Sequence, residues 1–242
     1  MTYYLWSQTP STTVLRIYSV ATGKLLHSWS TDTEVPLGPF NFAQYVQSNN
    51  QLSWVDGDRA LSFATSTYTG NPLNPTGVDI AVRTLDVTAS GGDLLADSRV
   101  VWSKQVSLGG QAPTEPVCSG DTSLTANGKT VVCDGIAGGP GPGQGEGIAK
   151  TRYAWRLVWG AYETSAPKGA RTLYEFTAHS TGHASWGSGI SVQWVDASGA
   201  TMIMAWSIAS QVTHFGVISH GRFTPLPSPP GITLGTPPDI AW

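Results

Sequence analysis

The sequence predicts an all-β protein built from antiparallel hairpins, and three observations indicate this fold class. Glycine and proline, 28 and 16 of 242 residues, recur along the chain and interrupt any helical pattern. Apolar and polar residues alternate over short segments, as in strands with one buried face. Three segments also share one hairpin design, and they span residues 51–66, 121–136 and 191–207.

Composition supports one globular domain covering residues 1–242. Apolar residues make up 40% of the chain, and ten tryptophans would be left unburied in a disordered chain. Charged residues make up only 12%, against about 25% in an ordinary soluble domain. A single all-β domain often reaches this length, so we expect no internal domain boundary.

Charge and hydropathy exclude two classes of partner. The net charge is −3 and basic residues form no cluster longer than a pair, so we expect no binding to nucleic acid. No run of apolar residues is long enough to span a membrane. The first residues, MTYYLW, lack the basic start and apolar segment of a signal peptide. The protein is therefore cytoplasmic, or its export segment lies outside this chain.

The first element is a hairpin at residues 15–29, LRIYSVATGKLLHSW, in which Ala-Thr-Gly-Lys forms the turn. The three hairpins of common design each place a polar turn, with Gly next to Asp, Asn or Ser, between a short strand and an apolar strand. Aligned on these turns, Trp54, Leu124 and Trp194 take one position, at a spacing of 70 residues each time. A constant spacing of this kind indicates repeated units.

A second kind of hairpin alternates with the first. Its members span residues 15–29, 78–102, 153–176 and 214–227. One hairpin of each kind makes a four-stranded antiparallel unit, and such units arranged around an axis form a β-propeller. The sequence therefore predicts a propeller of four-stranded blades.

Two of these segments resemble known propeller families. LRIYSVATGKLLHSW resembles the outer strand pair of a WD40 blade, and LTANGKTVVC, residues 124–133, resembles the inner strand pair of WD40 and TolB-like blades. The chain also resembles WD40-like propeller domains of actinobacterial, often membrane-anchored, proteins of unassigned function. The resemblance implies the same β-propeller architecture.

The two ends of the chain fit one shared blade. PPDIAW, residues 237–242, matches the start of an inner hairpin, and TYYLWS, residues 2–7, matches the second strand of one. Three complete blades and one shared blade would close a four-bladed ring, and we expect a closed ring to be a monomer. The alternative is that the chain forms part of a larger propeller.

The two cysteines, Cys118 and Cys133, are too few for a four-cysteine zinc site. In a hairpin that turns at Asn127-Gly128, Cys133 faces Thr122, so a disulfide requires residues 115–120 to curl back. We expect a structural disulfide between Cys118 and Cys133, with two buried thiols as the alternative. A disulfide favours an oxidising compartment, secreted or membrane-anchored through a segment outside this chain.

The sequence predicts no catalytic residue, no metal site and no cofactor. The glycine-rich stretch at 137–147 lacks the helix and the Gly-Lys-Ser/Thr ending of a phosphate-binding loop. His179 and His183 lie in a Gly- and Ser-rich stretch without helical spacing, so we expect solvated loop residues. The aspartates near the inner hairpins are expected to bond the backbone of turns. They are Asp56, Asp58, Asp121, Asp134 and Asp196.

Two groups of tryptophans are assigned different roles. The first group is expected to fill the wedge between blades: Trp54, Trp194 and Trp242. The second group lies near loops, where its members either pack in the core or contact a ligand, and it supplies the candidate ligand-binding residues: Trp155, Trp159 and Trp186.

These observations favour a propeller-type domain that binds a protein or peptide partner and does not catalyse a reaction. Loops from several blades gather at each end of a propeller axis and form a broad surface. The alternative is a carbohydrate-binding or glycoside-hydrolysing propeller. Two carboxylates about 5–10 Å apart beside an aromatic platform would favour that alternative.

Overall fold

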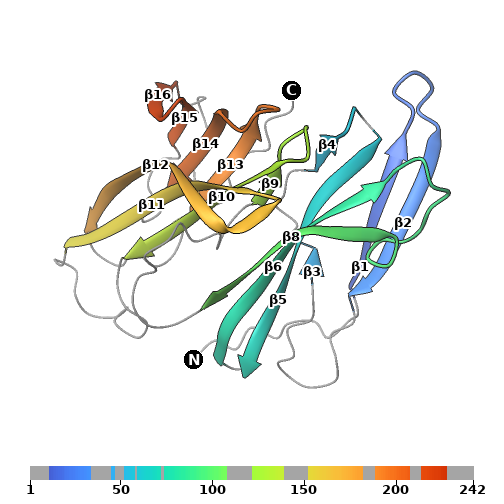
Figure 1. Cartoon of the computed structure of the whole chain (residues 1–242), viewed down its shortest axis with the longest axis horizontal. Coiled ribbons are helices and arrows are strands. Elements are labelled where there is room, and N and C mark those ends of the chain that lie inside the picture. The colour runs from blue at the N-terminus through green and yellow to red at the C-terminus, as the bar shows by residue number, and fades with distance from the viewer. Residues whose placement is uncertain are drawn as a thin grey trace.

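The computed structural model is all-β in its described part, and its strands form four sheets (Figure 1). This confirms that the fold is all-β, as the sequence predicts. No helix in that part of the chain has the length and apolarity needed to cross a membrane. The structure describes residues 11–33, 45–46, 52–57, 59–71, 74–107, 122–138, 152–181, 189–207 and 214–227.

We name the sheets A to D in chain order. Sheet A contains β1 (Ser11–Tyr18), β2 (Leu25–Thr33) and β7 (Gly92–Asp93). Sheet B contains β3 (Tyr45–Val46), β4 (Ser53–Val55), β5 (Ala60–Asn71), β6 (Asn74–Asp86) and β8 (Ser98–Ser107). Sheet C contains β9 (Thr122–Leu124), β10 (Thr130–Gly138), β11 (Arg152–Glu163) and β12 (Ala166–Thr181). Sheet D contains β13 (Gly189–Val195), β14 (Thr201–Ser207), β15 (His214–Ser219) and β16 (Arg222–Leu226).

Sheets B, C and D share one connectivity. Each begins with a hairpin, β4–β5, β9–β10 or β13–β14, and two more antiparallel strands follow in order. In sheet B, β3 and β4 both pair with β5 along the same strand. The hairpin predicted at residues 15–29 is also confirmed, as β1–β2, although β7 joins β2 in parallel over two residue pairs.

The register corrects the predicted alignment of the third hairpin. In the first two, the turns begin two residues after Trp54 and Leu124. In the third, the backbone N–H of Asp196 bonds the carbonyl of Thr201, so the turn begins two residues after Val195. Val195, rather than Trp194, is therefore the counterpart of Leu124. A β-bulge in β13 just before Trp194 accompanies this change of register.

The sheets pack face to face in chain order, with sheet A at one end of the series (Figure 1). The core between sheets A and B contains Leu15, Trp29, Leu61, Phe63, Leu85, Val87 and Leu94. The core between sheets B and C contains Val55, Val78, Ile80, Val82, Trp102, Val106, Leu124, Val131, Cys133 and Tyr162. The core between sheets C and D contains Val132, Leu157, Trp159, Val192, Met202, Met204 and Ile218.

Strand β10 shows how one strand serves two cores. Val131 and Cys133 point toward sheet B, whereas Val132 points toward sheet D. This follows from the alternation of side chains across a strand. All three side chains are fully buried, and burying a side chain the size of valine contributes about 1.5–3 kcal/mol.

The predicted packing role of Trp54 and Trp194 is wrong. Trp54 and Trp194 are 44% and 39% exposed, although each lies on the first strand of its hairpin. The pleat buries the neighbouring Val55 instead of Trp54. Trp242, which was assigned the same role, lies outside the described residues.

The predicted shared blade also falls outside the described residues, because both of its segments, 2–7 and 237–242, do. Ring closure therefore stays a prediction.

On the outer face of β1, Val14 and Tyr18 are 42% and 51% exposed, whereas Leu15 faces the core.

One edge of the molecule, which we call the turn edge, carries the turns that follow β4, β9 and β13. In each of sheets B, C and D, a backbone carbonyl of this turn accepts an N–H from a later connection of the same sheet. The three bonds are Val87 to Arg59 at 3.0 Å, Thr164 to Lys129 at 2.8 Å and His220 to Ala200 at 3.2 Å. The turns are therefore fixed to their sheets by backbone bonds.

Neighbouring sheets are also joined near this edge. The backbone N–H of Asp56 donates to the carbonyl of Ala126 at 3.0 Å. Three residues earlier in each hairpin, the hydroxyls of Ser53 and Ser123 lie 3.0 Å apart. The first two hairpins are thus held side by side by polar contacts as well as by the apolar core.

Gly216→Ala is expected to destabilise the protein by about 1–3 kcal/mol, because overpacking a core forces side chains to move. A Cβ added to Gly216 would lie 1.8 Å from Cε2 of Phe223, whose ring covers the glycine. Thermal unfolding followed by circular dichroism measures the effect. Gly169→Ala is the control, because a Cβ there meets nothing within 4 Å. Equal melting temperatures for the two variants would contradict this account of Gly216.

Candidate ligand-binding pocket

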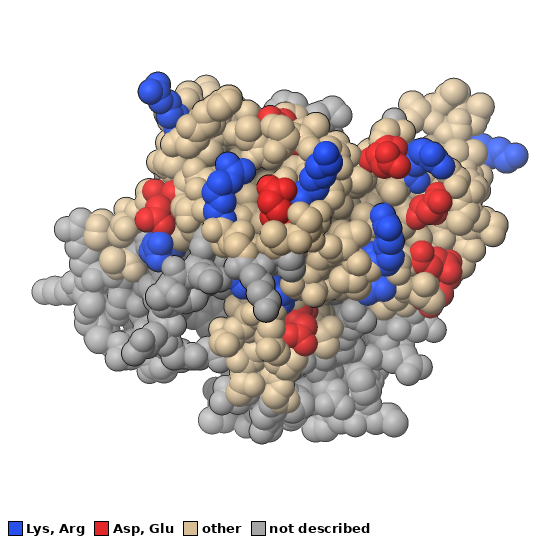
Figure 2. Space-filling view, in the orientation of Figure 1, with Lys and Arg blue, Asp and Glu red and all other residues tan. Residues whose placement is uncertain are grey.

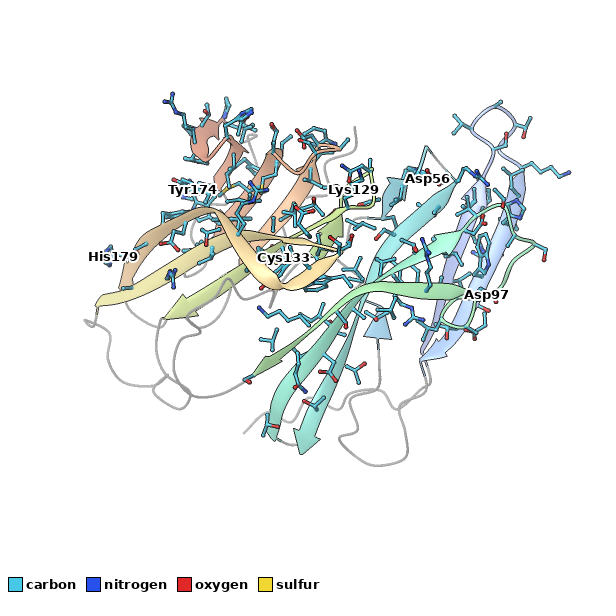
Figure 3. All side chains as sticks on the ribbon, viewed as in Figure 1. Asp56, Asp97, Lys129, Cys133, Tyr174 and His179 are labelled. Carbon is cyan, nitrogen blue, oxygen red and sulfur yellow. The ribbon has the colours of Figure 1, made fainter. Side chains whose placement is uncertain are left out.

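A pocket of about 390 Å³ lies at the turn edge of sheet B. Its lining comes from the β4–β5 turn, the end of β6 and the start of β8. Acidic and basic side chains alternate over the right-hand part of Figure 2, the region in which Figure 3 labels Asp56 and Asp97. The lining residues are Asp56, Arg59, Ala60, Thr84, Asp86, Asp97 and Arg99.

Strand alternation places part of this lining. Thr84 and Asp86 are two residues apart on β6, so they share a face of the sheet. Arg99 lies opposite Thr84 on β8, and its Nε donates to Thr84 Oγ1 at 3.2 Å. Further back along β6, the same face carries Val82, which packs against sheet C. The pocket therefore lies at the point where this apolar interface reaches the turn edge.

The β4–β5 turn supplies the first side of the pocket. Asp56 and Gly57 have φ angles of 56° and 61°, in the left-handed region that glycine and aspartate tolerate best. The bond from the Asp56 N–H to Ala126 holds this turn against sheet C. Arg59, the last residue of the turn, accepts the N–H of Val87. Two backbone bonds thus fix the pair of charged residues, Asp56 and Arg59.

The connection between β6 and β8 supplies the opposite side. The carboxylate of Asp93 accepts the N–H groups of Leu95 at 2.9 Å and Ala96 at 2.7 Å. The N–H of Asp97 donates to the carbonyl of Asp93 at 3.0 Å. Gly92 allows the close approach, because a Cβ there would lie 2.4 Å from Oδ2 of Asp97. This local network fixes the backbone that carries Asp97.

Arg83 ties the same connection to the sheet. Its guanidinium donates to the carbonyl of Leu95 at 2.7 Å and to the hydroxyl of Ser98 at 2.8 Å. Burial lowers the pKa of the Arg83 guanidinium from its ordinary value. These bonds compensate for that burial, so Arg83 acts as a structural cation behind the pocket.

Asp86 is held as a carboxylate inside the pocket. Its Oδ1 accepts the hydroxyl of Thr88 at 2.6 Å and the backbone N–H of Thr88 at 2.9 Å. The hydroxyl bond, the N–H bond and the charge of Arg59 together lower the pKa of Asp86. The pocket thus presents three aspartates and two arginines. Within the described residues, no group of three or more His, Cys, Asp or Glu is placed to hold a metal ion.

Of the three candidate ligand-binding tryptophans, Trp159 has a described side chain, and it does not line this pocket. Trp159 is fully buried between sheets C and D, and its ring stacks on Phe176 with centroids 6.0 Å apart. The candidate binding role of Trp159 is therefore wrong, and its position agrees with the alternative, packing in the core. Trp155 lies on β11 opposite Ala178, but its side chain is outside the described residues, as is the whole of Trp186. The binding roles of Trp155 and Trp186 stay predictions.

Cys133 lies on β10 opposite Thr122, as the hairpin alignment predicts. Its side chain is fully buried in the core between sheets B and C, and it is disulfide-bonded. Cys118 is the only other cysteine in the sequence and lies outside the described residues. The pairing of Cys118 with Cys133 therefore stays a prediction.

The predicted turn role of the aspartates holds for Asp196 and is wrong for Asp134. Asp56 lies in its predicted turn, but among the described residues its carboxylate accepts no hydrogen bond from the turn backbone. Oδ1 of Asp196 accepts the N–H groups of Ser198 and Ala200, both at 3.0 Å. Asp134 lies within β10, opposite Trp159, and is 1% exposed. Asp58 and Asp121 lie outside the described residues.

The pocket itself was missed by reading the sequence. Its charged residues come from three separate segments, and each looks like an ordinary turn or a solvent-facing strand position. The available local signal was the Val-Asp-Gly-Asp-Arg stretch at 55–59, which places two aspartates and an arginine in one turn. Only the fold brings Asp86, Asp97 and Arg99 beside that turn.

Comparison with known proteins does not assign the chain to a family. No family model and no curated protein matches it. Among solved structures, a Mycobacterium tuberculosis puromycin-hydrolyzing peptidase matches with 9% identity and a TM-score of 0.37. The match covers 88% of this chain and 30% of the peptidase chain, so this chain spans under a third of that protein. Similarity at this level identifies neither a shared fold nor a shared activity.

Asp196→Ala is expected to lower the free energy of unfolding by about 1 kcal/mol at neutral pH, through loss of turn hydrogen bonds. Burial raises the pKa of the Asp196 carboxyl, but bonds from Ser198, Ala200 and Thr201 outweigh burial and lower it overall. A carboxyl whose pKa is lower in the folded state than in the unfolded state stabilises the folded state at pH values above its unfolded pKa. This stabilisation is lost as the pH falls below about 4.

Urea unfolding at neutral pH and at acidic pH measures this effect. Asp196→Asn keeps an acceptor oxygen without the charge, so its deficit relative to the native chain is expected to shrink in acid. Asp79→Ala, at an exposed position on β6, is the control for loss of a carboxylate outside the turn. A deficit of Asp196→Asn that stays constant with pH would contradict the role of the charge.

Proposed function

We propose that this chain is a non-catalytic binding domain of the β-propeller type, and that its partner is a protein or a peptide. The observation that carries the proposal is the pocket at the turn edge of sheet B. It combines five charged side chains on turns and strand ends that backbone bonds hold in place. Charged groups presented on a rigid scaffold give a binding site orientation and specificity.

The lining favours a peptide or protein over a carbohydrate. Sugar-binding sites use an aromatic platform, and among the described residues the pocket is lined by carboxylates and guanidinium groups without an aromatic side chain. The aromatic cluster around Trp159 and Phe176 lies between sheets C and D instead. Charged side chains of a protein partner complement such a lining directly.

The propeller architecture is part of this proposal. Each of the three described sheet interfaces joins consecutive sheets face to face, as consecutive blades do. We propose that sheets A to D are four blades and that segments 2–7 and 237–242 complete sheet A. The closed ring would be a monomer. A larger propeller, of which this chain forms part, is the alternative.

We also propose that the domain works in an oxidising compartment outside the cytoplasm. The disulfide at Cys133 supports this, because disulfides persist mainly in such compartments. The bond would fix the segment around Cys118 to the core between sheets B and C. This gives the disulfide a structural role.

Peptide display tests the binding role. A random peptide library selected on the folded chain is expected to yield peptides that bind it saturably in solution. Arg59→Ala combined with Arg99→Ala is expected to weaken those peptides at least tenfold, whereas Arg156→Ala is not. Arg156 is an exposed residue of sheet C paired with Glu175. The proposal fails if no peptide is enriched, or if hydrolysis of a glycoside is found and depends on Asp86 or Asp97.

Thiol labelling tests the disulfide. Without reductant, the denatured chain is expected to take up no maleimide, and after reduction it is expected to take up two, one per cysteine. Intact-mass measurement counts the labels. Cys133→Ala is the control and is expected to accept one label without reductant. Two labels on the denatured, unmutated chain without reductant would contradict both the disulfide and the proposed oxidising compartment.

A further inference from the structure

The charged groups of the pocket are only partly used by the fold. Asp86 holds the turn through Thr88, and Arg99 contacts Thr84 through Nε alone. Among the residues that the structure describes, no side-chain hydrogen bond or ion pair engages the carboxylates of Asp56 and Asp97. These carboxylates and the remaining guanidinium N–H groups of Arg99 are available to a ligand.

The two signs of charge are interleaved within the pocket. Asp97 and Arg99 are two residues apart where β8 begins, and both line the pocket. On the other side, Asp56 and Arg59 belong to one turn, and the charge of Arg59 acts on Asp86. A ligand of a single sign would therefore meet repulsion along with attraction, whereas a ligand of both signs would find a partner for each charge.

We propose that this pocket binds a peptide segment in which an acidic and a basic side chain lie close together. The inference rests on the proposed function, which it deepens by naming the chemistry of the partner. The acidic side chain would accept hydrogen bonds from Arg59 and Arg99, since a guanidinium pairs with a carboxylate through two parallel bonds. The basic side chain would donate to Asp56 and Asp97.

The size and net charge of the pocket fit this ligand. A volume of about 390 Å³ is near the lower end of the range for binding pockets, about 300–1,000 Å³. Such a pocket holds the ends of two side chains. Three carboxylates outnumber two guanidinium groups, which disfavours a polyanion such as nucleic acid. A single phosphate that contacted both arginines would also be repelled by those carboxylates.

Three short blocked peptides test the charge preference. They share one sequence except at two positions, which are separated by a single alanine. These two positions carry Lys and Glu in the first peptide, two Lys in the second and two Glu in the third. Fluorescence anisotropy of labelled peptides against the whole chain, at one salt concentration, measures affinity. The Lys–Glu peptide is expected to bind at least tenfold more tightly than either of the others. Raising the salt concentration is expected to weaken its binding.

Charge reversal tests the assignment of groups to the pocket. Arg99→Glu is expected to shift the preference toward the two-Lys peptide, and Asp97→Lys toward the two-Glu peptide. Both residues are exposed, and circular dichroism melting of each variant checks that it folds. Arg156→Glu is the matched control, since it reverses an exposed arginine on sheet C. It is expected to leave all three affinities unchanged.

The outcomes separate this inference from the proposed function. Equal binding of the three peptides, or a Lys–Glu preference that survives both reversals, overturns the inference. If peptides selected by display still lose affinity in the Arg59 and Arg99 double variant, the proposed function stands and only the partner chemistry is wrong. If no peptide of any kind binds, both proposals fail.

Discussion

The structure depends on the burial of both faces of its central sheets. An antiparallel sheet with one exposed apolar face is stable only if something covers that face, and here the next sheet along the chain does so. Val131 and Val132 are adjacent in β10 and fully buried, yet they belong to two different cores. Such a strand cannot slip by one residue without exchanging the two sets of side chains, so the same burial also fixes register.

The turn edge follows from this stacking. Once consecutive sheets lie face to face, the turns after β4 and β9 come side by side, and the bond between Asp56 and Ala126 becomes possible. Within sheets B, C and D, a carbonyl of each such turn also accepts an N–H from a later connection. The β4–β5 turn that borders the pocket is thus held by backbone hydrogen bonds at both of its ends, Asp56 and Arg59. Its charged side chains vary in position through their own rotamers rather than through movement of the loops that carry them.

The sequence predicted what depends on local pattern and missed what depends on the packing of one sheet on another. Glycine-containing polar turns located the hairpins at 51–66, 121–136 and 191–207, and alternation placed Cys133 opposite Thr122. The exposure of Trp54 and Trp194 was not predictable, because a large aromatic residue on an apolar strand reads as core. The bulge in β13 shifts the register of the third hairpin by one residue. The residue at the bulge, Gln193, is neither glycine nor proline, so nothing in the sequence signals it. The pocket had no sequence signal as a unit, since Asp56, Asp86 and Asp97 meet only after sheet B has formed.

The pocket concentrates charged residues in a chain that has few of them. There are 13 lysines and arginines and 16 aspartates and glutamates in 242 residues, and five of these line one hollow of about 390 Å³. Sheet stability does not require them there, because the apolar cores lie deeper along the same strands and all five residues are exposed. Opposite charges on neighbouring exposed positions contribute little to folding, about 0–1 kcal/mol for each pair. Core packing and the charges of the pocket are therefore carried by different residues of the same strands: Val82 is buried in the core on β6, and Asp86 reaches the solvent four residues later. Because of this separation, we expect that the charges of the pocket can be changed without loss of the fold, as the proposed binding function requires.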